Sequence, residues 1–89
     1  PVLAILPYDS VEEAVEIANN SEYGLGGGVW AESREAGIDV ARRIRTGQVD
    51  VNGAIPTADL PFGGFKKSGI GREGGVHAVE EFLEMKTIF

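Results

Sequence analysis

The side chains that could do ionic or acid–base chemistry gather late in this chain of 89 residues. They are Lys66, Lys67, Arg72, Glu73 and the single histidine, His77. Among them, Gly69, Gly71 and Gly74 form a G-x-G-x-x-G pattern, which is typical of loops that bind a dinucleotide. That fingerprint needs a strand directly before it and an acidic residue about 20 positions later. Here an irregular loop precedes the glycines and residue 89 is the last, so turns or close packing explain them better than pyrophosphate binding.

A second match to the pattern, at Gly26, Gly28 and Ala31, falls within an expected strand, where no helix N-terminus would face a phosphate. A small phosphate or nucleotide binder built on residues 69–74 therefore stays open only as a minor hypothesis.

The composition excludes several classes of function. Eight basic residues against 14 acidic ones give a net charge of −6, which argues against nucleic-acid or anionic-lipid partners. Without cysteine the chain has no disulfide, no thiolate metal site and no cysteine nucleophile. The longest apolar run, Val2–Leu6, is far shorter than the about 20 residues that span a bilayer. We expect a cytoplasmic protein with no metal site and no membrane or nucleic-acid partner.

The elements that must position these side chains follow an α/β pattern. Ser10 followed by Glu13 resembles a capping box, and Ser33 can cap a second helix that ends near Gly47. Strand, helix, strand, helix and strand in that order predict a parallel sheet with right-handed crossovers. A long glycine-rich loop, a helix and a short terminal strand complete the plan. The expected elements lie at residues 2–6 (strand), 10–18 (helix), 26–31 (strand), 33–47 (helix), 49–52 (strand), 76–83 (helix) and 85–89 (strand).

A parallel sheet needs cover on both faces, and the expected helices are too few to supply it. We therefore interpret residues 1–89 as a partial domain, an edge portion of a larger α/β domain.

The long loop carries the most specific sequence signal. It begins after Val49–Asn52 and contains Pro61-Phe-Gly-Gly-Phe-Lys66, followed by Ser68-Gly-Ile-Gly-Arg-Glu73. The chain also begins Pro1-Val-Leu and contains Asn19-Asn-Ser-Glu-Tyr-Gly-Leu25 and Glu81-Phe-Leu-Glu-Met-Lys-Thr87. In this order and spacing, residues 1–87 resemble the C-terminal part of the catalytic domain of the aldehyde dehydrogenase superfamily.

This resemblance implies a parent enzyme that oxidises an aldehyde to a carboxylic acid with NAD or NADP. In the family a cysteine attacks the aldehyde, hydride passes to the cofactor, and a glutamate activates the water that releases the acid. These groups would lie upstream of Pro1, which resembles the last residue of the family's E-x-F-G-P string. We therefore expect the 89-residue chain alone to be inactive and to bind no cofactor. Its expected partners are the remainder of the dehydrogenase chain and sister subunits of a homo-oligomer.

The resemblance also assigns candidate substrate-binding residues. Phe62 corresponds to a family position whose aromatic ring lines the substrate tunnel, where an apolar wall excludes water. The alternative is that Phe62 is an ordinary core residue. Ile55, Pro56 and Leu60 belong to a stretch of variable length that borders the tunnel. Because that stretch contains no aromatic residue, we do not expect strong selectivity for aryl substrates.

Glu73 matches a family glutamate that passes protons between the general base and bulk water, and it is the candidate proton relay here. The alternative is an ion pair with Lys66, Lys67 or Arg72 that fixes the loop. His77 is expected on the exposed side of its helix.

Asp50 departs from the family, which often has an apolar or aromatic residue in this strand, and the sequence does not indicate its partner. A competing hypothesis for the whole chain is a non-catalytic interaction module derived from the same fold, whose uncovered sheet edge pairs with related chains.

Overall fold

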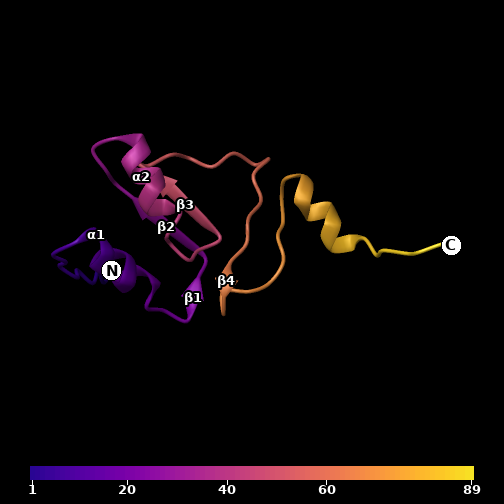
Figure 1. The fold of residues 1–89 in the computed structure, drawn as a ribbon, viewed down its shortest axis with the longest axis horizontal. Helices are drawn as coiled ribbons and strands as arrows, with labels where there is room; N and C mark the ends of the chain where they lie inside the picture. Colours follow the sequence, from indigo (N-terminus) through magenta and orange to yellow (C-terminus); the bar gives the residue numbers. More distant parts are fainter.

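The computed structural model describes all residues, Pro1–Phe89, and shows an elongated molecule. Its extents are 58 × 32 × 27 Å, and its radius of gyration is 16.2 Å. A compact domain of this length would have a radius of gyration of about 12 Å. In Figure 1 the first two helices and the strands gather at one end, while the C-terminal residues form an arm that points away from them.

The best-connected part is a strand–helix–strand unit. β2 (Gly26–Val29) pairs in parallel with β3 (Gln48–Val51), and α2 (Arg34–Ala41) joins them. The register runs from Gly26 opposite Gln48 to Val29 opposite Val51. Gly37 lets α2 approach β3, because a Cβ added there would lie 2.5 Å from Cγ1 of Val51. The small α/β character expected from the sequence is therefore present.

Both expected N-caps are confirmed. The hydroxyl of Ser10 accepts the Glu13 N–H at 3.1 Å and begins α1 (Val11–Asn19). Glu13 completes the box differently from expectation, because its carboxylate accepts the N–H of Asp9 at 2.8 Å rather than that of Ser10. At α2 the hydroxyl of Ser33 accepts the Ala36 N–H at 3.1 Å.

The expected three-stranded parallel sheet is wrong in this structure. Neither residues 2–6 nor residues 85–89 form a strand, and all of them are exposed. Their sequences favour a strand, but no neighbouring segment receives their backbone hydrogen bonds, and a strand exists only as a paired one. Instead, β1 (Tyr23–Gly24) pairs antiparallel with β4 (Phe65–Lys66), and β4 lies inside the long loop that we expected to be irregular.

Two further expectations need correction. The helix expected at residues 76–83 is a 3₁₀-helix, η1 (Val76–Phe82), which has no side-chain cap and no buried residue. The second helix, expected to end near Gly47, ends already at Ala41, and Gly47 has no left-handed conformation that would mark a helix end. Gly47 is needed for a different reason, since a Cβ there would overlap the carbonyl oxygen of Gly63.

Very little of the chain is buried. Only Val15, Gly24, Gly37 and Gly64 are, so a single apolar side chain makes up the core. Large apolar residues at both ends are almost fully exposed, including Val2 and Phe89. None of the helices is long and apolar enough to cross a membrane.

Candidate functional site

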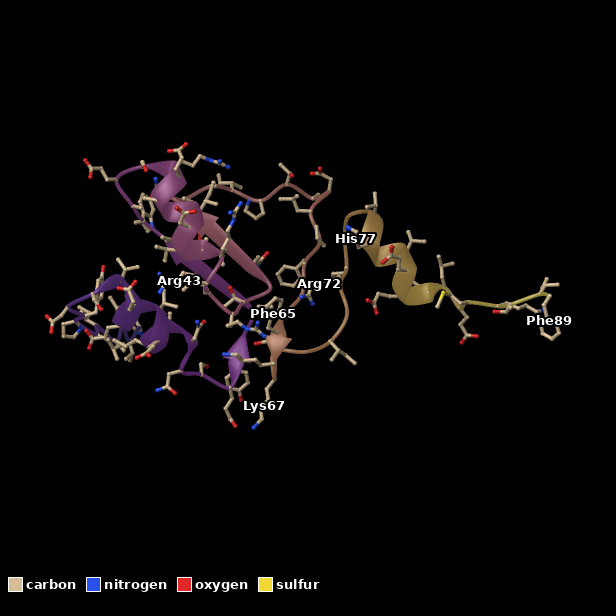
Figure 2. The ribbon with its side chains drawn as sticks, in the orientation of Figure 1. Arg43, Phe65, Lys67, Arg72, His77 and Phe89 are labelled. Carbon is tan, nitrogen blue, oxygen red and sulfur yellow. The ribbon has the colours of Figure 1, made fainter.

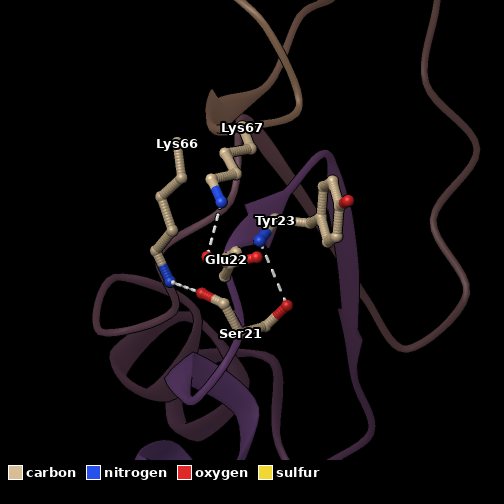
Figure 3. A network of polar contacts seen from close by, with 5 residues as sticks. All are labelled: Ser21, Glu22, Tyr23, Lys66 and Lys67. Atoms are coloured by element: carbon tan, nitrogen blue, oxygen red, sulfur yellow. Dashed lines mark hydrogen bonds and ion pairs between the residues drawn. The ribbon is translucent and has the colours of Figure 1, made fainter.

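The loop that carries the candidate residues is anchored to the first half of the chain through β4. Lys66 has a left-handed backbone (φ 55°), and its ammonium group donates to the carbonyl oxygens of Asn19 at 2.9 Å and Ser21 at 3.0 Å. Lys67 pairs with the carboxylate of Glu22, as Figure 3 shows. The two lysines therefore fasten the loop to the end of α1 and the start of β1.

Arg72 fixes the next turn of the loop. Its guanidinium donates to the carbonyl oxygens of Gly64 at 3.1 Å and Gly71 at 2.7 Å. The same group lies 5.5 Å from the centre of the Phe65 ring (Figure 2), and Arg45 lies 5.4 Å from it. Two cations within about 6 Å of one aromatic ring make cation–π contacts that hold the ring in place. Phe65 is thus a structural anchor of the loop.

Phe62 and Glu73 meet as an isolated antiparallel bridge across the loop. The Phe62 N–H donates to the Glu73 carbonyl at 2.7 Å, and the Glu73 N–H donates back at 2.9 Å. These two backbone hydrogen bonds hold the two ends of the 62–73 loop together. The candidate tunnel residue and the candidate proton relay are therefore brought side by side.

A pocket of about 630 Å³ lies where the loop passes over the sheet, within the range of about 300–1,000 Å³ usual for ligand pockets. Ile55, Pro56 and Leu60, three of the predicted substrate-binding residues, contribute to its wall, together with Gln48 and Asp50 of β3. A neighbouring hollow of about 540 Å³ shares Gln48, Pro56 and Leu60 with it and adds Phe62 and Glu73. We call these two adjoining hollows, which share wall residues, the β3 groove.

The structure thus gathers every sequence-predicted site residue along the β3 groove. Phe62 is 42 % exposed, so it is not buried in this structure. Ile55, at 89 %, and Leu60, at 52 %, are also exposed. The groove has an apolar wall that is open on one side.

Glu73 does not form the ion pair that was its alternative explanation. It takes part in none of the three ion pairs of the structure, and its side chain is exposed. Lys66, Lys67 and Arg72 are engaged with the other partners described above. The carboxylate at the rim of the β3 groove is therefore unpaired.

His77 is exposed on its helix, as expected, and lines neither hollow of the β3 groove. Its Nδ1 is 3.8 Å from Glu80 on the same 3₁₀-helix, and both side chains are largely exposed. Between groove residues of the loop, a hydrogen bond from Thr57 and then one from its own backbone lower the pKa of the exposed Asp59.

The G-x-G-x-x-G segment does not form a phosphate cradle. Gly69, Gly71 and Gly74 all have positive φ angles, which explains the choice of glycine there. A Cβ on Gly71 would lie 3.2 Å from a carboxylate oxygen of Glu81, so an acid faces the loop. Since Arg72 is occupied by carbonyl groups, the charge near these glycines opposes an anionic ligand.

Sequence reasoning missed the role of Asp50. Its carboxylate lines the β3 groove and accepts the Gly53 N–H at 3.1 Å. An acidic residue followed three positions later by glycine, with Asn52 between them, is a turn signal that could have identified this bond. Gln48, which lines both hollows of the groove, carried no such signal.

Comparisons with known proteins give one consistent result. The sequence profile described as "Aldehyde dehydrogenase family" matches residues 1–88. Among curated proteins, the chain is 47 % identical over 89 residues to geranial dehydrogenase of Castellaniella defragrans, covering all of this chain and 19 % of that protein. It is 48 % identical over 88 residues to a putative aldehyde dehydrogenase of Staphylococcus aureus, covering 99 % of this chain and 18 % of that one.

Solved structures agree with the sequence matches. An NAD⁺ complex of Mycobacterium tuberculosis aldehyde dehydrogenase is 51 % identical with a TM-score of 0.86, over 92 % of this chain and 17 % of that one. A mutant of aldehyde dehydrogenase C from Pseudomonas syringae, solved with NAD⁺ and octanal, is 51 % identical with a TM-score of 0.89, over 94 % and 17 %. The chain therefore spans less than a fifth of the length of these relatives.

Proposed function

The chain belongs to the aldehyde dehydrogenase family, and we propose that it is the C-terminal segment of the catalytic domain of an NAD(P)⁺-dependent member. In this role it shapes the substrate tunnel and part of a subunit interface, and it contributes no nucleophile. The parent enzyme oxidises an aldehyde to a carboxylic acid, with the cofactor accepting the hydride. The support is the order and spacing of the loop motifs together with the 17–19 % share of its relatives that the chain covers.

The observation that carries this proposal is the β3 groove. Pro56, Leu60 and Phe62 supply an apolar wall, and the unpaired carboxylate of Glu73 lies at the same rim. An apolar wall holds an alkyl chain and excludes water, while a carboxylate open to solvent can pass protons. A related enzyme was solved with octanal, so an aldehyde with an apolar chain is the substrate class that we propose.

The cofactor is proposed to bind the remainder of the parent enzyme. NAD⁺ is present in two of the similar structures, and in the parent it would supply the hydride acceptor. This chain offers no cradle for a pyrophosphate, because the glycine loop faces Glu81 and Arg72 is already engaged. Residues 1–89 alone are therefore proposed to bind neither NAD nor NADP.

The parent sheet would complete the elements that lack partners here. Val2–Leu6 is a β-favouring run with an unpaired backbone, as is the end of the chain at residues 85–89. Both are proposed to become strands when neighbouring segments of the parent chain or of a sister subunit pair with them. Either pairing would restore the strand–helix–strand–helix–strand order expected from the sequence, and pairing with a sister subunit would make a homo-oligomer.

An aldehyde assay tests the proposed function. The protein that contains these residues together with its upstream chain is supplied with NAD⁺ or NADP⁺ and straight-chain aldehydes, and reduced cofactor is followed by absorbance. We expect aldehyde-dependent reduction by the parent and none by residues 1–89 alone. A parent that carries no cysteine nucleophile, or that oxidises no aldehyde with either cofactor, would overturn the assignment.

One observation favours a second candidate, the non-catalytic interaction module. The parallel β2–β3 sheet has only two strands, so each strand presents an outer edge that can pair with another chain. This candidate predicts that residues 1–89 alone bind a full-length family member with a defined stoichiometry. Sedimentation of the mixture distinguishes the two, because the tunnel segment is expected to self-associate without such a complex.

A further inference from the structure

The dipeptide Asn52–Gly53 at the end of β3 is chemically unusual. Both residues are exposed and both have positive φ angles, 56° for Asn52 and 75° for Gly53. The backbone nitrogen of Gly53 can attack the side-chain carbonyl carbon of Asn52, because the bond between them closes a five-membered ring. Glycine has no Cβ to obstruct this approach. We propose that Asn52 is a site of spontaneous deamidation and that the fold promotes the reaction.

Two hydrogen bonds act on the reacting atoms. The Gly53 N–H donates to the carboxylate of Asp50 at 3.1 Å, so a base lies against the nucleophilic nitrogen. The Ala31 N–H donates to the side-chain oxygen of Asn52 at 2.8 Å, where negative charge develops during the attack. The first bond draws the proton from the nitrogen, and the second stabilises the oxyanion. Neither bond involves the leaving amide nitrogen.

The reaction needs only water as a co-reactant. The Gly53 nitrogen bonds to Cγ of Asn52 as its proton passes to Asp50, and the Cγ–Nδ2 bond then breaks. The nitrogen group leaves as ammonia after taking up that proton, and a succinimide remains. Water opens the succinimide at either carbonyl, which yields aspartate or isoaspartate at position 52. No oxidant, reductant or cofactor takes part.

The product changes the junction between the sheet and the β3 groove. Asn52 ties the end of β3 to Ala31 just beyond β2, and residues 54–56 of the groove wall follow it directly. Deamidation adds a negative charge close to Asp50, and the isoaspartate form also adds a methylene to the backbone. The added methylene would displace residues 54–56 of the groove wall, and the added charge would repel the carboxylate of Asp50. Ageing of the protein is therefore expected to loosen this wall.

The test measures deamidation by peptide mapping and mass spectrometry during incubation at neutral pH. The purified parent protein that contains these residues is compared in native buffer and in urea, with Asp50→Asn as the variant that removes the carboxylate. We expect residue 52 to convert faster in the native protein than in urea. Asp50→Asn should slow the native rate about tenfold or more, since a positioned base contributes about 10²–10⁴-fold. In urea the variant and the original should react alike.

Two controls keep the result specific. Asn20, which precedes Ser21, should deamidate at the same rate with and without Asp50→Asn, and Asn52→Gln should abolish conversion at position 52. The native-versus-urea comparison needs no variant, so it remains decisive if Asp50→Asn does not fold. A native rate below the rate in urea would overturn the proposal, because the two hydrogen bonds would then protect Asn52. An unchanged native rate in a folded Asp50→Asn protein would overturn it as well.

Discussion

Residues 10–52 and residues 53–89 differ in how their backbone N–H and C=O groups are hydrogen-bonded. The first region contains two side-chain-capped helices and the parallel β2–β3 pair, so most of its backbone hydrogen bonds are made within the region. The second region has a two-residue strand, an uncapped 3₁₀-helix and an extended end. It carries the candidate groove residues, which agrees with the general rule that function resides in loops held by a rigid scaffold. The contacts between the two regions are therefore the ones to disrupt.

The largest effect is expected at Gly47, where the first region packs directly against the backbone of the second. A Cβ at this position would overlap the carbonyl oxygen of Gly63, a backbone atom that cannot move aside as a side chain does. Gly47→Ala should cost about 3 kcal/mol, the upper part of the range for overpacking. Thermal melting of the protein measures the loss.

Gly26→Ala is the matched control for this substitution. Its added Cβ would meet only the Gln48 side chain, at an ordinary contact distance of 3.6 Å. If the Gly47→Ala and Gly26→Ala proteins have the same melting temperature, the two regions are not closely packed at Gly47.

The second prediction concerns the parent enzyme and distinguishes a structural role of Phe62 from a substrate-binding one. Phe62→Ala should lower kcat/KM for long aldehydes by an amount equivalent to about 1–3 kcal/mol, because the lost ring contacts only a long chain. Acetaldehyde should be affected much less. The melting temperature should change less than for a core phenylalanine, because a ring that lines a tunnel faces open space on one side.

A core role for Phe62 would give the opposite result. Truncation of a buried phenylalanine costs about 3–5 kcal/mol of stability, and activity would fall by a similar factor for every aldehyde. A chain-length series measured beside the melting temperature distinguishes the two outcomes. Unchanged chain-length preference with a large loss of stability contradicts the groove assignment.

The same division explains what the sequence could predict. The two N-caps and the β2–α2–β3 order depend on residues three or four apart and on local periodicity, which a sequence displays directly. The β1–β4 pair joins residues more than 40 positions apart, and neither two-residue strand has a periodic pattern. The prediction for Val2–Leu6 was wrong although its pattern is clear. The apolar run favours a strand, but no segment of this chain pairs with it.

The candidate site residues were proposed for a different reason. Phe62 and Glu73 come from the long family string, and Leu60 comes from the variable stretch before it. All three line one hollow of the structure, and their roles stay predictions. Gln48 was missed because no motif marks it. The turn signal at Asp50 and Gly53 indicates the local hydrogen bond but not the groove, because the place of both side chains depends on how the loop folds back over β3. Residues that belong to a family motif can be proposed from the sequence, while those defined by their spatial neighbours need the structure.

A third prediction compares the helices of the two regions. Ser33→Ala removes the acceptor for the Ala36 N–H and should cost about 1 kcal/mol of stability. Ser33→Asp, which can accept the same bond, should stay close to the original. At η1 no side chain caps the first turn, so alanine at Val76 should change stability by less than the Ser33→Ala substitution. Equal losses at both positions, measured by urea denaturation, would remove the distinction between the regions.

The smallest effect is expected at Lys67, whose ion pair with Glu22 also joins the regions (Figure 3). Both side chains are about two-thirds exposed, at 64 % and 67 %, so water and salt screen their attraction. Lys67→Met should therefore cost about 0.5 kcal/mol or less, and high salt should remove the difference. Lys66→Met is the matched comparison, because it leaves two backbone carbonyls without their donor, and it should cost more. A Lys67→Met loss equal to or above that of Lys66→Met would mean that charge pairing, and not backbone anchoring, holds the loop to the scaffold.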